Sequence, residues 1–154
     1  MYSNKLVLQI LDYLDRNLFR QIQIAEISES FYYNKDYIMR LFKKELGFTI
    51  IEYIHKKRVF MSLDSLKNTN SSIINISITF GFSSIEYYSE IFKKIIGVSP
   101  TLYRKFSRFQ FDGSFDEVYT IQDQLALLNE QMKFVEQYRL NIYKSEVKIL
   151  SIFS

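Results

Sequence analysis

One seven-residue pattern occurs twice in this chain, fifty residues apart. Residues 41–47 read LFKKELG and residues 91–97 read IFKKIIG. Within each copy the apolar positions recur at three- and four-residue spacing, which predicts the buried face of a helix, and the final glycine stands where a helix ends. A short helical pattern and a turn precede each copy. Because a short helix, a tight turn and a second helix form a helix-turn-helix unit, the repeat predicts two such units in one chain.

Capping residues around these patterns indicate where the helices begin. Asn34 and Thr49 carry side chains that cap a helix start. Ser99 is a third such cap, and Pro100 after it favours the first position of a helix. The expected elements are a first helix at about residues 4–17, a first helix-turn-helix unit at about 22–47, a connecting helix at about 49–66 and a second unit at about 73–97. Only four glycines and one proline occur among the 154 residues, and 47% of them are hydrophobic. This composition favours packed helices over a turn-rich β protein, so we predict an all-α fold.

Several classes of function find no support in the sequence. The chain has no cysteine and a single histidine, His55, with no partner at ligand spacing, so we expect no metal site. It has no glycine-rich phosphate loop and no nucleophile motif, so we expect neither a cofactor nor an enzyme. No apolar run approaches the roughly 20 residues that cross a bilayer, and the N-terminus lacks the pattern of a signal peptide. We expect a cytoplasmic protein that does not contact a membrane.

Basic residues are concentrated in the first two thirds of the chain. Residues 1–106 hold 15 Lys and Arg against 10 Asp and Glu, whereas residues 107–154 hold 5 against 7. An excess of positive charge on a helix-turn-helix region is the electrostatic requirement for binding the phosphate backbone of DNA. The charge distribution therefore favours DNA as the partner of residues 1–106.

Residues within and around the two helical patterns match a known family. In the second half the matching residues are Gly81-Phe82, Tyr87-Tyr88, Phe92-Lys93-Lys94, Gly97-Val98-Ser99-Pro100 and Tyr103-Arg104. In the first half they are Leu41-Phe42-Lys43-Lys44-Glu45, Gly47, Tyr53-Ile54 and Arg58. Together these residues resemble the signature of the AraC/XylS transcription regulators, which are bacterial and often activators. The resemblance covers residues 4–106 and implies a DNA-binding domain of seven helices with two helix-turn-helix units.

The resemblance also implies which residues meet DNA. Family members place two recognition helices, here at about residues 35–46 and 85–96, in successive major-groove segments about one helical turn (~34 Å) apart. The implied base-facing residues are Asp36, Met39 and Arg40 in the first unit and Ile85, Glu86, Ser89 and Glu90 in the second. The implied phosphate contacts are Lys35, Lys43, Lys44, Lys93, Lys94 and Arg104. RNA polymerase is a further partner that the resemblance suggests.

Two features depart from the family pattern. Glu86 and Glu90 stand where members often carry an amide or an arginine, and two carboxylates facing a polyanion are repelled by it. Arg40, by contrast, can make two hydrogen bonds to guanine, worth about 1–3 kcal/mol of discrimination. Tyr32 occupies a turn position that is often glycine, so a positive φ there would be strained. We also expect Arg58 to pin the two subdomains through a carboxylate, and His55 to be a polar surface residue.

The sequence after residue 106 no longer follows the helix-turn-helix pattern. We expect a linker at about residues 107–115 and one amphipathic helix at about residues 116–143. Its apolar positions follow a heptad spacing, with Arg139 completing the series: Ile121, Leu125, Leu128, Met132, Val135 and Ile142. Two interpretations stay open, a coiled coil that joins two copies of the chain and a helix packed on the chain's own domain. Residues 146–153 alternate between polar and apolar side chains, which predicts a short terminal strand.

These observations predict a sequence-specific regulator of transcription that binds double-stranded DNA and reads it mainly through the first recognition helix. The alternative is an interaction protein of the same fold. In that case Glu86 and Glu90 weaken DNA reading, and the C-terminal helix pairs with another regulator.

Overall fold

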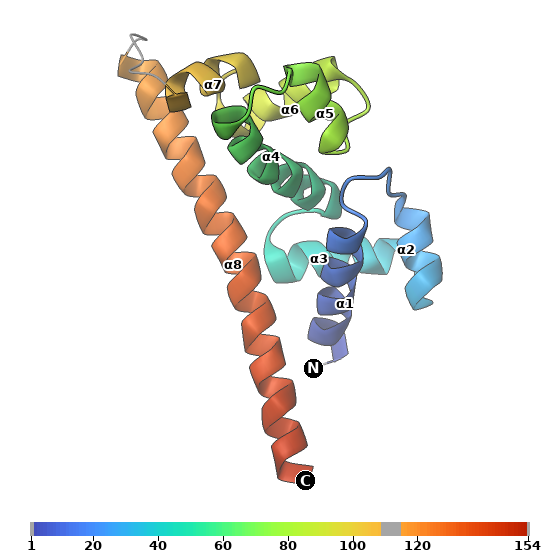
Figure 1. Cartoon of the computed structure of the whole chain (residues 1–154). Coiled ribbons are helices and arrows are strands. Elements are labelled where there is room, and N and C mark those ends of the chain that lie inside the picture. The colour runs from blue at the N-terminus through green and yellow to red at the C-terminus, as the bar shows by residue number, and fades with distance from the viewer. Residues whose placement is uncertain (1, 109–114, 154) are drawn as a thin grey trace. The chain divides into compact units, whose positions relative to one another are not determined.

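A computed structural model describes the backbone of residues 2–108 and 115–153 and the side chains of residues 4–108 and 118–152. Residues 109–114 of the expected linker lie outside this range. The described residues form eight helices, so the predicted all-α class is confirmed (Figure 1). In chain order they are α1 (Tyr2–Arg16), α2 (Ile24–Phe31), α3 (Lys35–Leu46), α4 (Ile50–Asn68), α5 (Ile73–Thr79), α6 (Ile85–Ile96), α7 (Pro100–Arg108) and α8 (Phe115–Phe153). No helix within these ranges is long and apolar enough to span a membrane.

The helices belong to two compact units. The first unit comprises the described parts of residues 1–17, 22–53 and 131–154, and the second comprises those of residues 18–21 and 54–130. The first unit therefore contains α1, α2, α3, the first turn of α4 and the C-terminal half of α8. The second contains the rest of α4, then α5, α6, α7 and the N-terminal part of α8.

The core of the first unit forms where the apolar stripe of α1 meets α2 and α3. Six apolar side chains of α1 are buried along one side of the helix, and α3 contributes about one buried residue per turn. The buried side chains of these three helices are Leu6, Val7, Leu8, Ile10, Leu11, Leu14, Ile27, Ile38, Leu41, Phe42 and Leu46. Tyr53, in the first turn of α4, is fully buried and lies edge-on to Phe42. This core leaves the opposite face of α3 exposed.

The ends of α3 are set by the residues that the sequence predicted. The Asn34 side chain accepts hydrogen bonds from the backbone N–H of Asp36 (2.8 Å) and Tyr37 (3.4 Å), which caps the helix start. Gly47 ends the helix in the left-handed conformation at φ 86°, and its N–H donates to the Lys43 carbonyl. Thr49 then caps α4 in a reciprocal pair with Glu52. The orientation of the α3 face is therefore fixed at both ends.

The second unit repeats this construction around a cluster of aromatic rings. Phe82, Tyr88, Phe92 and Tyr103 are buried and contact one another in sequence, with ring centroids 4.9–5.7 Å apart. The Tyr88 hydroxyl lies 2.8 Å from Ser62 Oγ on α4, and burial raises the pKa of Tyr88 to about 12. The α6 helix is thereby held with one face inward and the other exposed.

Arg58 of α4 anchors a loop in the second unit. Its Nε donates to the Leu18 carbonyl at 2.7 Å and its Nη2 to the Arg20 carbonyl at 2.8 Å. The guanidinium carbon also lies 5.6 Å from the centre of the Phe82 ring. A structural role was expected for Arg58, but its partners are backbone carbonyls of the second unit instead of the expected carboxylate between subdomains. The reason is that loop carbonyls without helical partners are the nearest acceptors at this buried position.

Tyr32, in the turn between α2 and α3, has the strained conformation that the sequence suggested. Its φ of 59° and ψ of 35° lie in the left-handed region, and it is the only residue other than glycine with a positive φ among those described. The turn depends on this conformation, because it brings the Tyr32 and Tyr33 N–H groups to the Ser28 carbonyl. The side chain itself is 94% exposed, so the ring contributes little packing to offset the strain.

Replacing Tyr32 with glycine should therefore stabilise the protein. We expect Tyr32→Gly to raise the free energy of unfolding by about 1 kcal/mol, because glycine adopts this conformation without a clash at Cβ. Urea denaturation followed by circular dichroism measures the change. Tyr32→Ala is the matched control, since it removes the exposed ring but keeps the strain, and it should change stability by less than about 0.5 kcal/mol. Equal stability of the two variants would contradict the assignment of strain.

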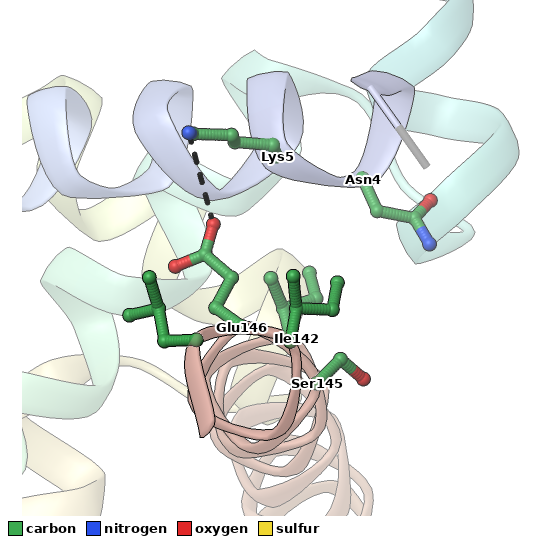
Figure 2. A pocket seen from close by; sticks show the side chains of 7 residues that line it. Asn4, Lys5, Ile142, Ser145 and Glu146 are labelled. Carbon is green, nitrogen blue, oxygen red and sulfur yellow. Dashed lines mark ion pairs between the residues drawn. The ribbon is translucent and has the colours of Figure 1, made fainter. Parts of the chain in front are cut away.

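The predicted terminal strand is wrong. Residues 146–153 continue the helix α8, which ends at Phe153. Helical spacing places Ile142, Glu146 and Ile149 on one face of α8. All three line a pocket with Asn4 and Lys5 of α1 in the first unit. Figure 2 shows this pocket, with Glu146 paired to Lys5 at 3.9 Å. A strand here would have had no partner, whereas a helix satisfies its own backbone.

Most of the apolar heptad on α8 is buried within the single chain. Ile121, Leu128, Met132 and Val135 are at most 6% exposed, while Leu125 and Ile142 are half-buried. This favours the second of the two interpretations, in which α8 packs on the chain's own domain. The four buried side chains are thus shielded within a single copy of the chain, and dimerisation through this seam stays a prediction.

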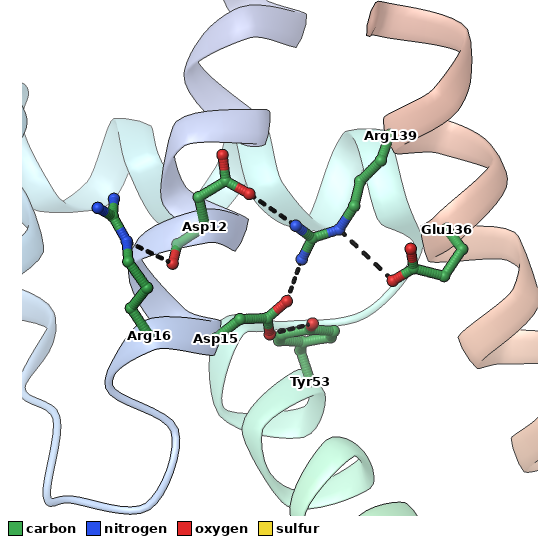
Figure 3. Close-up of polar contacts among 6 residues, drawn as sticks. All are labelled: Asp12, Asp15, Arg16, Tyr53, Glu136 and Arg139. Atoms are coloured by element: carbon green, nitrogen blue, oxygen red, sulfur yellow. Dashed lines mark hydrogen bonds and ion pairs between the residues drawn. The ribbon is translucent and has the colours of Figure 1, made fainter.

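Arg139 shows how α8 is attached to the first unit (Figure 3). Its Nη1 lies 2.6 Å from the carboxylate of Asp12 and its Nη2 pairs with Asp15, both on α1. Asp15 in turn accepts a hydrogen bond from the Tyr53 hydroxyl at 2.6 Å. Burial, and next the Asp15 charge, raise the pKa of Tyr53. The Arg139 Nε lies 3.6 Å from Glu136, too far for a hydrogen bond, and has no other partner among the described residues.

Candidate nucleic-acid interface

The exposed face of α3 gathers the predicted contacts of the first unit. Asp36, Met39 and Arg40, the implied base-facing residues, are all exposed. Met39 keeps 42% of its surface although it is apolar. The Arg40 guanidinium forms no hydrogen bond or ion pair with any residue that the structure describes, so its five donors are available to an external partner.

Lysines surround this face. Lys35, Lys43 and Lys44 are exposed, and their spacing along α3 places them beside the base-facing positions. With Arg40 they supply four positive charges against the single negative charge of Asp36. The surface is thus suited to a polyanion. The Arg40 guanidinium offers several hydrogen-bond donors in one plane, and the lysines around it act as point charges.

The corresponding face of α6, in the second unit, has a different balance. Glu86 and Glu90 are exposed and stand one turn apart, while Ile85 and Ser89 are half-buried. The exposed Lys93 and Lys94 follow in the last turn of α6, so two positive charges meet two negative ones and the face is neutral overall. The same helix-turn-helix construction therefore presents a basic helix face in one unit and a face of balanced charge in the other.

His55, expected at the surface, packs beside this face in the second unit. Its ring stacks on Phe82, and its Nε2 lies 2.8 Å from the Tyr87 hydroxyl on α6. Burial, followed by the charges of Arg58 and Lys94, lowers the pKa of His55. A neutral imidazole is therefore favoured at this position, so the only histidine adds no positive charge to the α6 face at neutral pH.

Arg104 differs from its predicted role as a phosphate contact. Its Nε donates to the Leu66 carbonyl at 2.9 Å, and its Nη2 donates to the carbonyls of Ser71 (2.7 Å) and Thr69 (3.4 Å). Arg108, one turn later on α7, donates to the Lys67 carbonyl at 2.8 Å. The two arginines hold the last turn of α4 and the loop that follows it, because the carbonyls at a helix end and in a loop have no helical partners. The structure thus gives Arg104 a structural role.

One part of the α3 surface was missed by the sequence reasoning. Tyr33, just before the helix, and Tyr37, in its first turn, are 45% and 39% exposed. Their rings stack with centroids 5.5 Å apart and an angle of 23° between the planes. The four-residue spacing of two aromatic residues at a capped helix start could have indicated the pair.

Comparisons with known proteins agree with this geometry. A family model described as "Helix-turn-helix domain" matches residues 27–105. The chain is 33% identical over 105 residues to "Probable transcription factor PqrA" of Proteus vulgaris, covering 67% of this chain and 86% of that protein. It is 29% identical over 103 residues to "HTH-type transcriptional activator AarP" of Providencia stuartii, covering 67% of this chain and 76% of the relative.

A solved structure gives the same result for the fold. The C-terminal domain of AraT, a response regulator from Geobacillus stearothermophilus, superposes with a TM-score of 0.64 at 25% identity, covering 71% of this chain and 92% of that one. The residues that the family model matches, 27–105, run from within α2 into α7 and include all of α3 and α6. The chain belongs to the AraC/XylS family of DNA-binding transcription regulators.

Proposed function

We propose that this regulator recognises its DNA sites mainly through the first unit, with α3 in the major groove and Arg40 reading a guanine. The α6 helix enters an adjacent major-groove segment and contributes affinity more than base discrimination. The observation that carries the proposal is the contrast in exposed charge: four exposed cations and one exposed carboxylate on α3, and two of each on α6.

Electrostatics support the division of roles. Phosphates surround any helix that enters a DNA groove, so each exposed lysine on α3 releases counterions on binding, and each exposed glutamate on α6 opposes the approach. Glu86 and Glu90 are still able to accept a hydrogen bond from the cytosine amino group, which restricts the bases that α6 tolerates. Binding dominated by α3 follows from this difference in charge.

The proposal predicts that Arg40→Ala relaxes sequence preference at one base pair. The preferred site is first selected from random-sequence duplexes with the wild-type chain. Binding of both proteins to that site and to its single-base variants is then measured by fluorescence anisotropy at several salt concentrations. We expect the variant to lose about tenfold in discrimination at one guanine position, corresponding to the loss of a bidentate contact.

Lys43→Ala is the matched control, because Lys43 lies on the same helix face but is expected to meet a phosphate. It should weaken binding to all duplexes alike and reduce the slope of log affinity against log salt by about 0.9. Unchanged base preference of Arg40→Ala would overturn the assignment of Arg40. Failure of the wild-type chain to enrich any site at low salt would overturn the proposed function itself.

The alternative, an interaction protein that pairs through its C-terminal helix, is favoured by one observation. The C-terminal half of α8 exposes the apolar side chains of Leu140, Val147 and Leu150 at 50%, 64% and 68%, and their spacing places them on one stripe of the helix. Such a cluster is typical of a surface that meets another protein, whether a second copy, another regulator or RNA polymerase. Sedimentation of the full chain distinguishes self-association from the rest, since a monomer mass at micromolar concentration excludes a stable homodimer.

A further inference from the structure

The stacked pair of Tyr33 and Tyr37 lies at the edge of the basic α3 face, in the first unit. Both rings are exposed although the unit has an apolar core within which aromatic residues of α3 and α4 are buried. The two hydroxyls form no hydrogen bond with any residue in the described part of the chain. The rings and their hydroxyls are therefore open to an external partner, and a tyrosine at a surface offers such a partner an apolar ring with a polar end.

The neighbours of the pair indicate which partner fits. Arg40 and Lys44 follow Tyr37 by three and seven residues, which places all three side chains on one stripe of α3. Asp36 directly precedes Tyr37 and so lies about 100° away around the helix. The pair is thus bordered by cations along its own stripe, as required for a surface that approaches a polyanion.

We propose that Tyr33 and Tyr37 form an uncharged contact with the DNA backbone, their hydroxyls donating hydrogen bonds to phosphate oxygens at the edge of the site that α3 reads. Tyrosine hydroxyls are regular donors to DNA phosphates, and the stack fixes the two rings before binding, which reduces the entropy lost on association. This inference rests on the proposed function, because it requires that α3 meets DNA.

An uncharged donor has a property that separates it from the lysines of the same face. Counterion release depends on the number of phosphates that are neutralised by charge, so removal of a hydroxyl leaves the salt dependence of binding unchanged. Removal of a lysine, by contrast, reduces the salt dependence of binding. Because phosphates are present in every sequence, the contact also strengthens binding to all duplexes equally.

The test compares Tyr37→Phe, Tyr33→Phe and the wild-type chain on the selected site and on an unrelated duplex. Each phenylalanine variant keeps the ring and its stack and loses only the hydroxyl. We expect about tenfold weaker binding to both duplexes for Tyr37→Phe, with an unchanged salt slope. Tyr143→Phe is the matched control, since Tyr143 is 44% exposed on α8 and should bind DNA as the wild-type chain does.

Each outcome decides the inference. Unchanged affinity of both phenylalanine variants overturns it, and so does a loss confined to one base sequence or accompanied by a reduced salt slope. The test also distinguishes failure of this inference from failure of the proposed function. Weaker binding of Tyr37→Phe to both duplexes supports the tyrosine contact even if Arg40→Ala keeps its base preference, whereas absence of any duplex binding by the wild-type chain removes both.

Discussion

Arg139→Met is expected to lower the free energy of unfolding by about 2–3 kcal/mol. Arg139 is 13% exposed and is the cation between Asp12 and Asp15, whose side chains are 35% and 25% exposed. Methionine preserves the length and the apolar stem of the side chain but leaves two partly buried carboxylates close together without a counter-charge. Removal of one partner of a buried ion pair costs about 3–5 kcal/mol, and the partial exposure of the aspartates reduces this figure.

The measurement is urea denaturation of the full chain, with amide hydrogen exchange in α1 to show that the first unit is affected. Lys133→Met is the matched control, because Lys133 is an exposed lysine of the same helix and the change should stay within about 0.5 kcal/mol. Adding Asp15→Asn to Arg139→Met should recover part of the loss, since the carboxylate that lost its partner is then neutral. If Arg139→Met unfolds at the same urea concentration as Lys133→Met, the ion pairs do not hold α8 on α1.

Gly81→Ala is expected to be the second strongly destabilising change, at about 3–4 kcal/mol. Gly81 has a φ of 88°, which costs an alanine about 1–2 kcal/mol. A Cβ at this position would also lie 2.8 Å from both the Cα and the carbonyl oxygen of Phe19, in the same unit. Those atoms belong to the backbone, so they move only if the loop moves, and overpacking of this kind adds about 1–3 kcal/mol.

Gly47→Ala provides an internal comparison for this prediction. Gly47 ends α3 at a similar φ of 86°, but a Cβ there would meet no atom within 4 Å. Its substitution should therefore cost only the conformational part, about 1 kcal/mol. The two variants are compared by thermal and urea denaturation under the same conditions. Equal losses would show that the close approach of Phe19 to Gly81 contributes nothing.

Much of the fold follows from patterns within short stretches of sequence. Three kinds of local signal act over three or four residues: the repeated Phe-Lys-Lys pattern, the capping side chains of Asn34 and Thr49, and the terminal glycines. They specify helices wherever the chain carries them. The same periodicity separated the buried from the exposed positions of α3, including Arg40. Apart from the stacked pair of Tyr33 and Tyr37, the exposed face of α3 was therefore predictable from residues 34–47 alone.

The structure of the C-terminal region could not be predicted from local patterns, because its sequence is compatible with more than one structure. The heptad of α8 fits a partner helix from a second chain as well as a groove on its own domain, and only the burial of Leu128, Met132 and Val135 distinguishes them. Residues 146–153 carry β-branched side chains in an alternating pattern, yet they extend a helix that is already nucleated. Local propensity is weak where an adjoining helix can propagate.

By itself, then, the sequence determined the two helix-turn-helix units, their caps and the basic face of α3, since each depends on neighbours along the chain. The tertiary structure alone decided the roles of residues whose partners are distant in sequence. Arg139 meets carboxylates 124 and 127 residues away, Arg104 meets carbonyls more than 30 residues away, and Gly81 differs from Gly47 only through Phe19. No local pattern carries such information, because the energy of these contacts arises only when the chain brings the partners together and removes them from water.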